Sequence, residues 1–160
     1  MAEYRSQLSV EDVERITAVT QATGFFSAEE VAIARELTTE NVTKGELLSE
    51  YYFLVLDSPQ GVDAFACYGP IPGTVGSFDL YWIVVSPSLQ GRGAGRSLIQ
   101  ATVARVVAAG GKRLYADTSS RAQYAPTRAF YERCGFSQVA LLDDYYDRGD
   151  GKVIYLRRLV

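Results

Sequence analysis

The feature that most constrains the fold is a strand pattern that runs directly into a glycine-rich turn and then a helix pattern. Residues 78–85 (FDLYWIVV) form the strongest strand pattern in the chain. Residues 93–109 carry apolar side chains at helical spacing, and a Gly-Gly pair stops the helix. Residues 114–118 read as a short strand. A strand, a helix and a strand in this order predict a right-handed parallel crossover within an α/β fold.

The remaining patterns place two helices before this crossover and a helix and two strands after it. Capping-box patterns at Ser9 and Ser27 predict helices that run to about residue 22 and to about residue 39. Pro126 suits the first turn of a later helix that ends at Gly135. The length of 160 residues favours a single domain spanning 1–160. The other strand patterns occupy residues 51–56, 62–68, 136–142 and 153–159.

The chain contains no histidine. This absence excludes Ser-His and Cys-His catalysis, a histidine general base and a histidine-ligated zinc. Proton transfer must therefore use Asp, Glu, Tyr, Cys, Lys or water. We expect no metal cofactor.

Charge and hydropathy exclude further classes. The net charge is −3 and no basic stripe is present, so we expect no nucleic-acid partner. No apolar run approaches the roughly 18 residues of a membrane span, and the first residues (MAEYRSQLSVEDVER) lack the apolar core of a signal peptide. Cys67 and Cys134 show no CxxC spacing, which is consistent with a reducing compartment. We therefore expect a cytoplasmic protein.

The glycine-rich turn, Gln90 to Gly95 (QGRGAG), has the features of an anion site. Free N–H groups at the start of a helix favour a negative ligand, and glycines let the backbone approach that ligand closely. The spacing is GxGxG, so it does not match the GxGxxG of dinucleotide-binding loops, and no lysine follows as in a P-loop. A turn that merely lets the strand and helix pack remains the alternative.

Two motifs together indicate a family. Residues 90–95 resemble the [QR]xxGx[GA] motif of the GNAT acyl-coenzyme A transferases, with Val85-Ser86-Pro87 before it. Residues 130–136 (FYERCGF) resemble that family's second signature, at a typical separation. The resemblance implies a GNAT fold: a mixed, mostly antiparallel sheet with a central splayed parallel pair, flanked by helices. It is weakest before Tyr51.

The resemblance also implies that acetyl-CoA is the co-substrate. Its pyrophosphate would bind the backbone N–H groups of the loop, and its pantetheine arm would pair with the end of the preceding strand. Many members have Asn seven residues before the catalytic tyrosine, whereas this chain has Tyr124. Either the Tyr124 phenol replaces the amide or the loop runs differently here. The implied cofactor-binding residues are Ile83, Val84, Val85, Gln90, Gly91, Arg92, Gly93, Ala94, Gly95, Arg96 and Tyr124.

The implied reaction is direct attack of an amine on the thioester. By motif position, Tyr131 would protonate the departing thiolate, although a core aromatic on an amphipathic helix is the alternative. Asp79, eleven residues before Gln90, is the candidate base and shares a strand face with Tyr81. Asp117 and water are its rivals. A backbone N–H near Val84 and Val85 would stabilise the oxyanion.

The acceptor is expected to be a small-molecule amine or a peptide N-terminal amine. Residues 143–147 (DDYYD) are interpreted first as a solvated turn, although carboxylates beside aromatic rings would also suit a cationic amine. Phe25 and Phe26 are interpreted as core residues, near which the acceptor pocket is also expected. A non-catalytic acyl-CoA sensor of the same fold is the rival function. Dimers are common in the family, and the sequence leaves the oligomeric state open.

Overall fold

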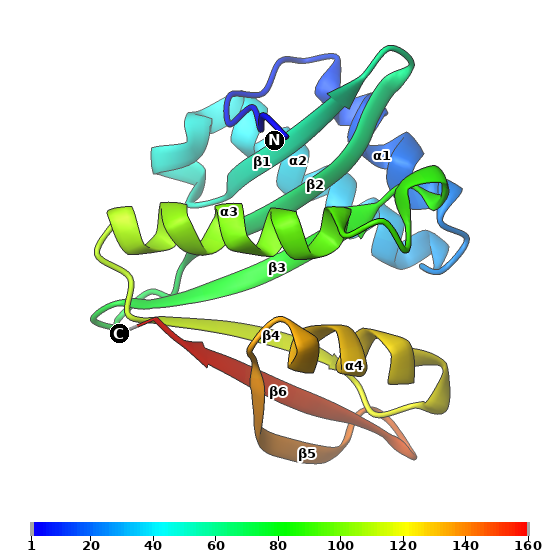
Figure 1. Cartoon of the computed structure of the whole chain (residues 1–160), viewed down its shortest axis with the longest axis vertical. Helices are drawn as coiled ribbons and strands as arrows, with labels where there is room; N and C mark the ends of the chain where they lie inside the picture. The colour runs from blue at the N-terminus through cyan, green and yellow to red at the C-terminus, as the bar shows by residue number, and fades with distance from the viewer. Residues whose placement is uncertain (1, 160) are drawn as a thin grey trace. The chain divides into compact units, whose positions relative to one another are not determined.

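The computed structural model of the protein describes residues 2–159, which contain four α-helices, two 3₁₀ turns and a six-stranded sheet (Figure 1). The strand order in the sheet is β1-β2-β3-β4-β6-β5. The elements are α1 (Asp12–Ala22), α2 (Ala28–Ser49), β1 (Tyr52–Ser58), β2 (Gly61–Pro70), β3 (Ser77–Val85), η1 (Pro87–Leu89), α3 (Ala94–Ala108), β4 (Arg113–Ser119), η2 (Ala122–Tyr124), α4 (Ala125–Arg133), β5 (Ser137–Asp147) and β6 (Asp150–Arg158).

The sheet is mixed, and β3 and β4 form its parallel pair. Their register runs from Ser77 opposite Arg113 to Leu80 opposite Ala116, whereas β3 continues to Val85 and β4 to Ser119. The pairs β1–β2, β4–β6 and β5–β6 are antiparallel. The predicted α/β class and the parallel crossover through α3 are confirmed.

The chain divides into two compact units, the first of which comprises residues 2–69 and Trp82–Thr102. Its core joins α1 to β1, β2 and the end of β3. Phe26 packs edge-on against Trp82 with ring centroids 4.9 Å apart, so Phe26 is a core residue as predicted, whereas Phe25 is more exposed. The buried core residues are Ile16, Val19, Phe53, Val55, Val62, Phe65, Cys67 and Val84.

The segment before α1 is held to the first unit by a charged network. Arg5 forms a backbone bridge with Val55, and its guanidinium binds Asp12 at 2.7 Å and Asp57 at 2.7 Å. The Asp12 side chain is fully buried. Although burial opposes it, hydrogen bonds from Arg5 and from the Ser9 N–H hold the pKa of Asp12 below its ordinary value.

The first helix ends at Ala22 as predicted, whereas the second is longer than predicted. At Ser27 the capping box forms with Glu30, but α2 continues to Ser49 through a non-helical residue, Gly45, instead of ending near residue 39. At Ser9 only half of the box forms: the Asp12 carboxylate accepts the Ser9 N–H, and α1 begins without a side-chain cap. The Asp12 carboxylate thus binds Arg5 as well as the Ser9 N–H, and the C-terminal part of α2 is largely exposed.

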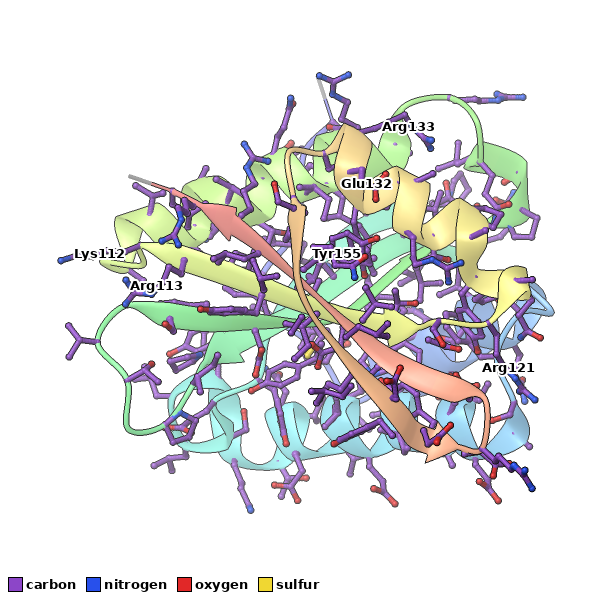
Figure 2. All side chains as sticks on the ribbon, turned by 90° about the horizontal axis from the view of Figure 1, so that it is seen from below. Lys112, Arg113, Arg121, Glu132, Arg133 and Tyr155 are labelled. Atoms are coloured by element: carbon purple, nitrogen blue, oxygen red, sulfur yellow. The ribbon has the colours of Figure 1, made fainter. Side chains whose placement is uncertain are left out.

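The second unit comprises Pro70–Tyr81 and residues 103–159. Helix α4 packs on the face of β6 that carries Tyr155. The Tyr131 ring lies 5.7 Å from the Tyr155 ring and 5.4 Å from the Phe136 ring. The Tyr155 hydroxyl donates to Glu132 at 3.3 Å, and both residues are labelled in Figure 2. These aromatic contacts fix α4 on the sheet.

Strand β5 is longer than predicted. It continues to Asp147, and the turn itself is Arg148–Gly149, so the interpretation of residues 143–147 as a turn is wrong. The register with β6 slips between Leu142 and Asp147. The segment therefore belongs to a strand with an irregular pairing and not to the turn.

Cys67 and Cys134 are both buried, lie in different units and form no disulfide. Burial raises the pKa of the Cys67 thiol well above its ordinary value. Both thiols belong to the packing of their units.

Candidate active site

The glycine-rich loop of the first unit is folded as an anion site requires. Gln90 Nε2 donates to the Val85 carbonyl at 3.1 Å, which fixes the loop to the end of β3. Gly91 and Gly93 have φ of 77° and 81°, a region that glycine adopts without strain. The Gly93 carbonyl accepts the Ser97 N–H at 3.0 Å and so begins helix α3.

The first turn of α3 therefore has N–H groups that the helix itself does not pair. Ala94, Gly95 and Arg96 occupy this turn, where N–H groups have no partner earlier in the helix. Arg92 and Arg96 are exposed and add positive charge. The Tyr4 hydroxyl donates to Ser97 Oγ at 2.8 Å and braces the turn. The helix dipole and the guanidinium groups both favour a phosphate at this position.

The predicted pantetheine-binding residues directly precede the loop. Val84 is buried in the core of the first unit, whereas Ile83 and Val85 are half-buried. The Ser86 N–H donates to the Asp63 carbonyl at 2.7 Å and fixes the end of β3 against β2. The predicted cofactor-binding residues from Ile83 to Arg96 thus form the end of β3, the loop and the start of α3. Their contact with a cofactor stays a prediction.

The candidate base belongs to the second unit. Asp79 lies on β3 opposite Tyr115, and Asp117 lies two residues further along β4 on the same face. The Asp79 side chain is half-buried. Burial, and then the charge of Asp117, raise the pKa of Asp79 to about 6, while Lys152 acts in the opposite direction. A carboxylate with this pKa is suited to accept a proton near neutral pH.

Asp117, the rival base, is engaged in an ion pair. Its carboxylate lies 3.2 Å from Lys152 Nζ, and its side chain is 37% exposed. The same ammonium lies 4.6 Å from the centre of the Tyr145 ring. Because Asp117 already has a cationic partner, Asp79 is the better candidate for proton uptake.

Tyr131, the candidate acid, lies on α4 and is buried. Burial, and then the charge of Asp117, raise its pKa above the ordinary value. Among residues 2–159 its hydroxyl has no hydrogen-bond partner. The residue shows the core packing of the alternative interpretation, and its role as the acid stays a prediction.

Tyr124 stands at the start of α4 and is half-buried. The approach to this helix is fixed by Arg128, whose Nη1 donates to the carbonyls of Ser119 at 2.7 Å and Arg121 at 2.9 Å. Arg128 thereby connects α4 to the end of β4. A contact between Tyr124 and a cofactor stays a prediction.

Three residues that the structure places in this region were not singled out from the sequence: Lys152, Tyr145 and Arg128. No local signal marks Lys152, because its partner Asp117 is far away in the chain and meets it only through the β4–β6 register. Tyr145 was noted only as part of the 143–147 run. Arg128 lies within the quoted segment before Tyr131, but nothing there indicates the carbonyls that it binds.

Two cavities of the first unit lie elsewhere. One, of about 680 Å³, is lined by residues that include Arg5, Arg15 and Gly61, and the other lies along α2. None of the predicted site residues lines either cavity. Over residues 2–159 no group of three His, Cys, Asp or Glu side chains is placed to hold a metal ion. In the same range no helix has both the length and the apolar character of a membrane span.

The comparisons with known proteins decide the family. The model of the Acetyltransferase (GNAT) family matches residues 21–136, which is more than half of the chain. The chain belongs to the GNAT acetyltransferase family. None of the curated proteins compared with it matches.

Solved structures agree with this assignment. A Desulfovibrio desulfuricans protein assigned to the GNAT acetyltransferases is 40% identical, has a TM-score of 0.95 and covers 100% of both chains. Two others share the fold. The ribosomal-protein-S18-alanine N-acetyltransferase of Escherichia coli is 21% identical (TM-score 0.75, 99% of this chain and 94% of that chain). The PaiA N-acetyltransferase of Thermoplasma acidophilum, in complex with coenzyme A, is 19% identical (TM-score 0.73, 99% of both chains).

The family model covers some of the candidate site residues and not others. It includes Asp79, the Gln90–Gly95 loop and Tyr131, and it ends before Lys152 and Tyr145. The candidate base, loop and acid thus lie in the shared part of the chain. The ion pair and the β5 bulge lie partly or wholly outside it.

Proposed function

We propose that this GNAT acetyltransferase moves an acetyl group from acetyl-CoA to a primary amine by direct attack in a ternary complex. The observation that carries the proposal is the loop from Gln90 to Gly93, which is tied to the end of β3, leads directly into the first turn of α3 and is flanked by two exposed arginines. When bound there, acetyl-CoA supplies an activated acetyl thioester. Known coenzyme A complexes of proteins with this fold support the choice of cofactor.

The residues of the first unit bind and orient the cofactor. The N–H groups of Gly91–Arg96 would bind its pyrophosphate, with charge from Arg92 and Arg96. The backbone of Ile83–Val85 would pair with the pantetheine arm in the manner of an added strand. An N–H group near Val84 and Val85 would stabilise the negative charge that develops on the carbonyl oxygen.

The residues of the second unit handle the protons. Because amines are protonated at neutral pH, Asp79 takes a proton from the acceptor, directly or through water, before the nitrogen attacks. Its pKa of about 6 leaves it about 90% ionised at pH 7. The protonated Tyr131 phenol would donate a hydrogen bond and then a proton to the departing sulfur, and the second proton lost by the attacking nitrogen would restore the phenol through water.

A binding and turnover assay tests the proposal. Acetyl-CoA at a hundred times its Kd should stabilise the protein by about 2.7 kcal/mol, seen as a higher Tm. Thiol release should then be followed with small monoamines, diamines, amino acids and peptides with free N-termini. Binding without release for any acceptor would indicate an acyl-CoA sensor, and no binding at millimolar acetyl-CoA would contradict the cofactor assignment.

The acceptor class follows from the same face of the sheet. Asp79 and Asp117 lie near the tyrosines of β4 and β5, which suits a cationic amine, either a small molecule or a peptide N-terminus. We expect the reaction to take place in the cytoplasm.

A further inference from the structure

Lys152 occupies a special position on the face that carries Asp79. Asp79 pairs with Tyr115, and Asp117 pairs with Ile154, two residues from Lys152. Because side chains two residues apart on a strand share a face, Asp79, Asp117 and Lys152 all lie on one face of the second unit. The face thus carries two carboxylates and one ammonium from three neighbouring strands.

The ammonium of Lys152 is held from two sides. It lies 3.2 Å from Asp117 Oδ2 and 4.6 Å from the centre of the Tyr145 ring. Its side chain is 20% exposed, against 37% for Asp117. Although burial opposes it, the hydrogen bond and charge of Asp117 raise the pKa of Lys152, so the ammonium stays charged throughout the neutral range.

The β5 bulge is built to place the Tyr145 ring. Asp144 adopts φ of 53°, which is uncommon for a non-glycine residue. Its carboxylate accepts the Gly149 N–H at 2.7 Å and closes the bulge against the turn. Tyr145 follows and meets Tyr146 edge-on, with centroids 5.0 Å apart. The irregular pairing of β5 thus coincides with the residue whose ring lies over Lys152, Tyr145.

We propose that Lys152 is a positioning residue that holds Asp117 and offsets its charge, so that Asp79 is the carboxylate of this face that accepts the proton. Two uncompensated carboxylates on one face would compete for a single proton. With Asp117 paired, the burial of Asp79 sets its affinity for the proton. The catalytic consequence rests on the proposed function, whereas the charge arrangement does not.

The groups of the second unit that surround Asp79 are few. Asp117 on β4 raises its pKa and Lys152 on β6 lowers it. Tyr115 is its partner on β4, and Tyr81 is its neighbour on β3. Tyr146, from the bulge, has a pKa raised by burial and then by Asp117. Lys152 is therefore the cation of the second unit that opposes Asp117 at Asp79.

A carboxyl ¹³C NMR titration of the labelled protein tests the proposal without acetyl-CoA or an acceptor. The Asp79 signal is identified by its loss in Asp79→Asn. In Lys152→Met the Asp79 midpoint should rise by about half a pH unit or more. Lys152→Arg should keep the wild-type midpoint, and Lys152→Met combined with Asp117→Asn should bring it back to the wild-type value or below. Lys44→Met, which removes another ion-paired lysine (with Glu40), is the matched control and should change nothing.

An unchanged Asp79 midpoint in Lys152→Met would overturn the proposal, as would a rise that persists in the double variant. The ion pair is partly exposed and contributes about 1 kcal/mol, so Lys152→Met should fold. If it does not, Lys152→Gln, which also removes the charge, takes its place in the titration. In a protein that releases thiol, the acid limb of the pH–rate profile must move with the NMR midpoint. A protein that shows the NMR shift but no turnover would contradict only the proposed function.

Discussion

Replacing Asp79 with asparagine should stabilise the protein while it slows catalysis. Asparagine has the same shape but carries no charge, so Asp79→Asn removes the cost of a half-buried carboxylate beside Asp117. The pKa of Asp79 rises from an ordinary 3.8 to about 6. At 1.36 kcal/mol per unit, two units correspond to about 3 kcal/mol. Because the side chain is partly exposed, we expect about 1–2 kcal/mol, or about 3–6 °C in Tm.

The stability gained in Asp79→Asn should depend on pH in a definite direction. The folded state holds the Asp79 proton more tightly than the unfolded state, so the wild type loses stability as the pH rises from about 4 through 6. The advantage of Asp79→Asn should therefore be full above about pH 7 and should vanish below about pH 4. Urea unfolding at half-unit pH steps measures it directly.

The matched control is Asp143→Asn, which removes an exposed aspartate of β5 and should leave the stability unchanged. The reasoning is refuted if Asp79→Asn is no more stable than the wild type at pH 7, or if its advantage persists unchanged at pH 4. A stable variant with full turnover would keep the electrostatic argument but remove Asp79 as the base.

Three further predictions concern other parts of the molecule. Tyr131→Phe should lower turnover at least tenfold and leave acetyl-CoA affinity nearly unchanged in calorimetry; equal turnover would place the acid elsewhere. Gly93→Ala and Gly73→Ala should each lose about 1–2 kcal/mol, because both glycines have φ near 80° in open space, but only Gly93→Ala should weaken acetyl-CoA binding. Arg5→Met should cost about 2–3 kcal/mol at pH 7, because it removes the nearest cation from the buried Asp12 and leaves only Arg15 at 3.7 Å; the loss should shrink as the pH falls towards about 4, because Asp12 of the variant takes up a proton there, and a constant loss across this range would contradict the assignment.

Much of the fold was predictable because its signals are local. The apolar strand of residues 78–85, the glycine spacing after it and the Ser27 capping box each depend on neighbouring residues, and the structure confirms all three. The loop at Gln90 was predictable for the same reason. Two of its glycines, Gly91 and Gly93, have positive φ and open space around them, so backbone conformation and not crowding explains glycine at these positions.

What could not be predicted depends on register between distant strands. The ion pair of Asp117 with Lys152 forms because Asp117 is paired with Ile154, and a slip of one residue would turn Lys152 to the other face. The raised pKa of Asp79 likewise requires its burial and the nearby Asp117, which no sequence spacing reports. The extension of α2 beyond residue 39 includes a kink at Gly45, and the sequence pattern does not mark it.

The burial of both cysteines has a practical consequence for enzymology. A thiol reagent that reports the release of coenzyme A reacts with accessible thiolates, and burial keeps the Cys67 thiol protonated and both sulfurs shielded in the folded protein. Colour or fluorescence from such a reagent should therefore count product molecules with little background from the enzyme. In the absence of substrates, the rate at which the same reagent labels the two thiols should report the rate of unfolding, since each thiol should react only when its unit opens.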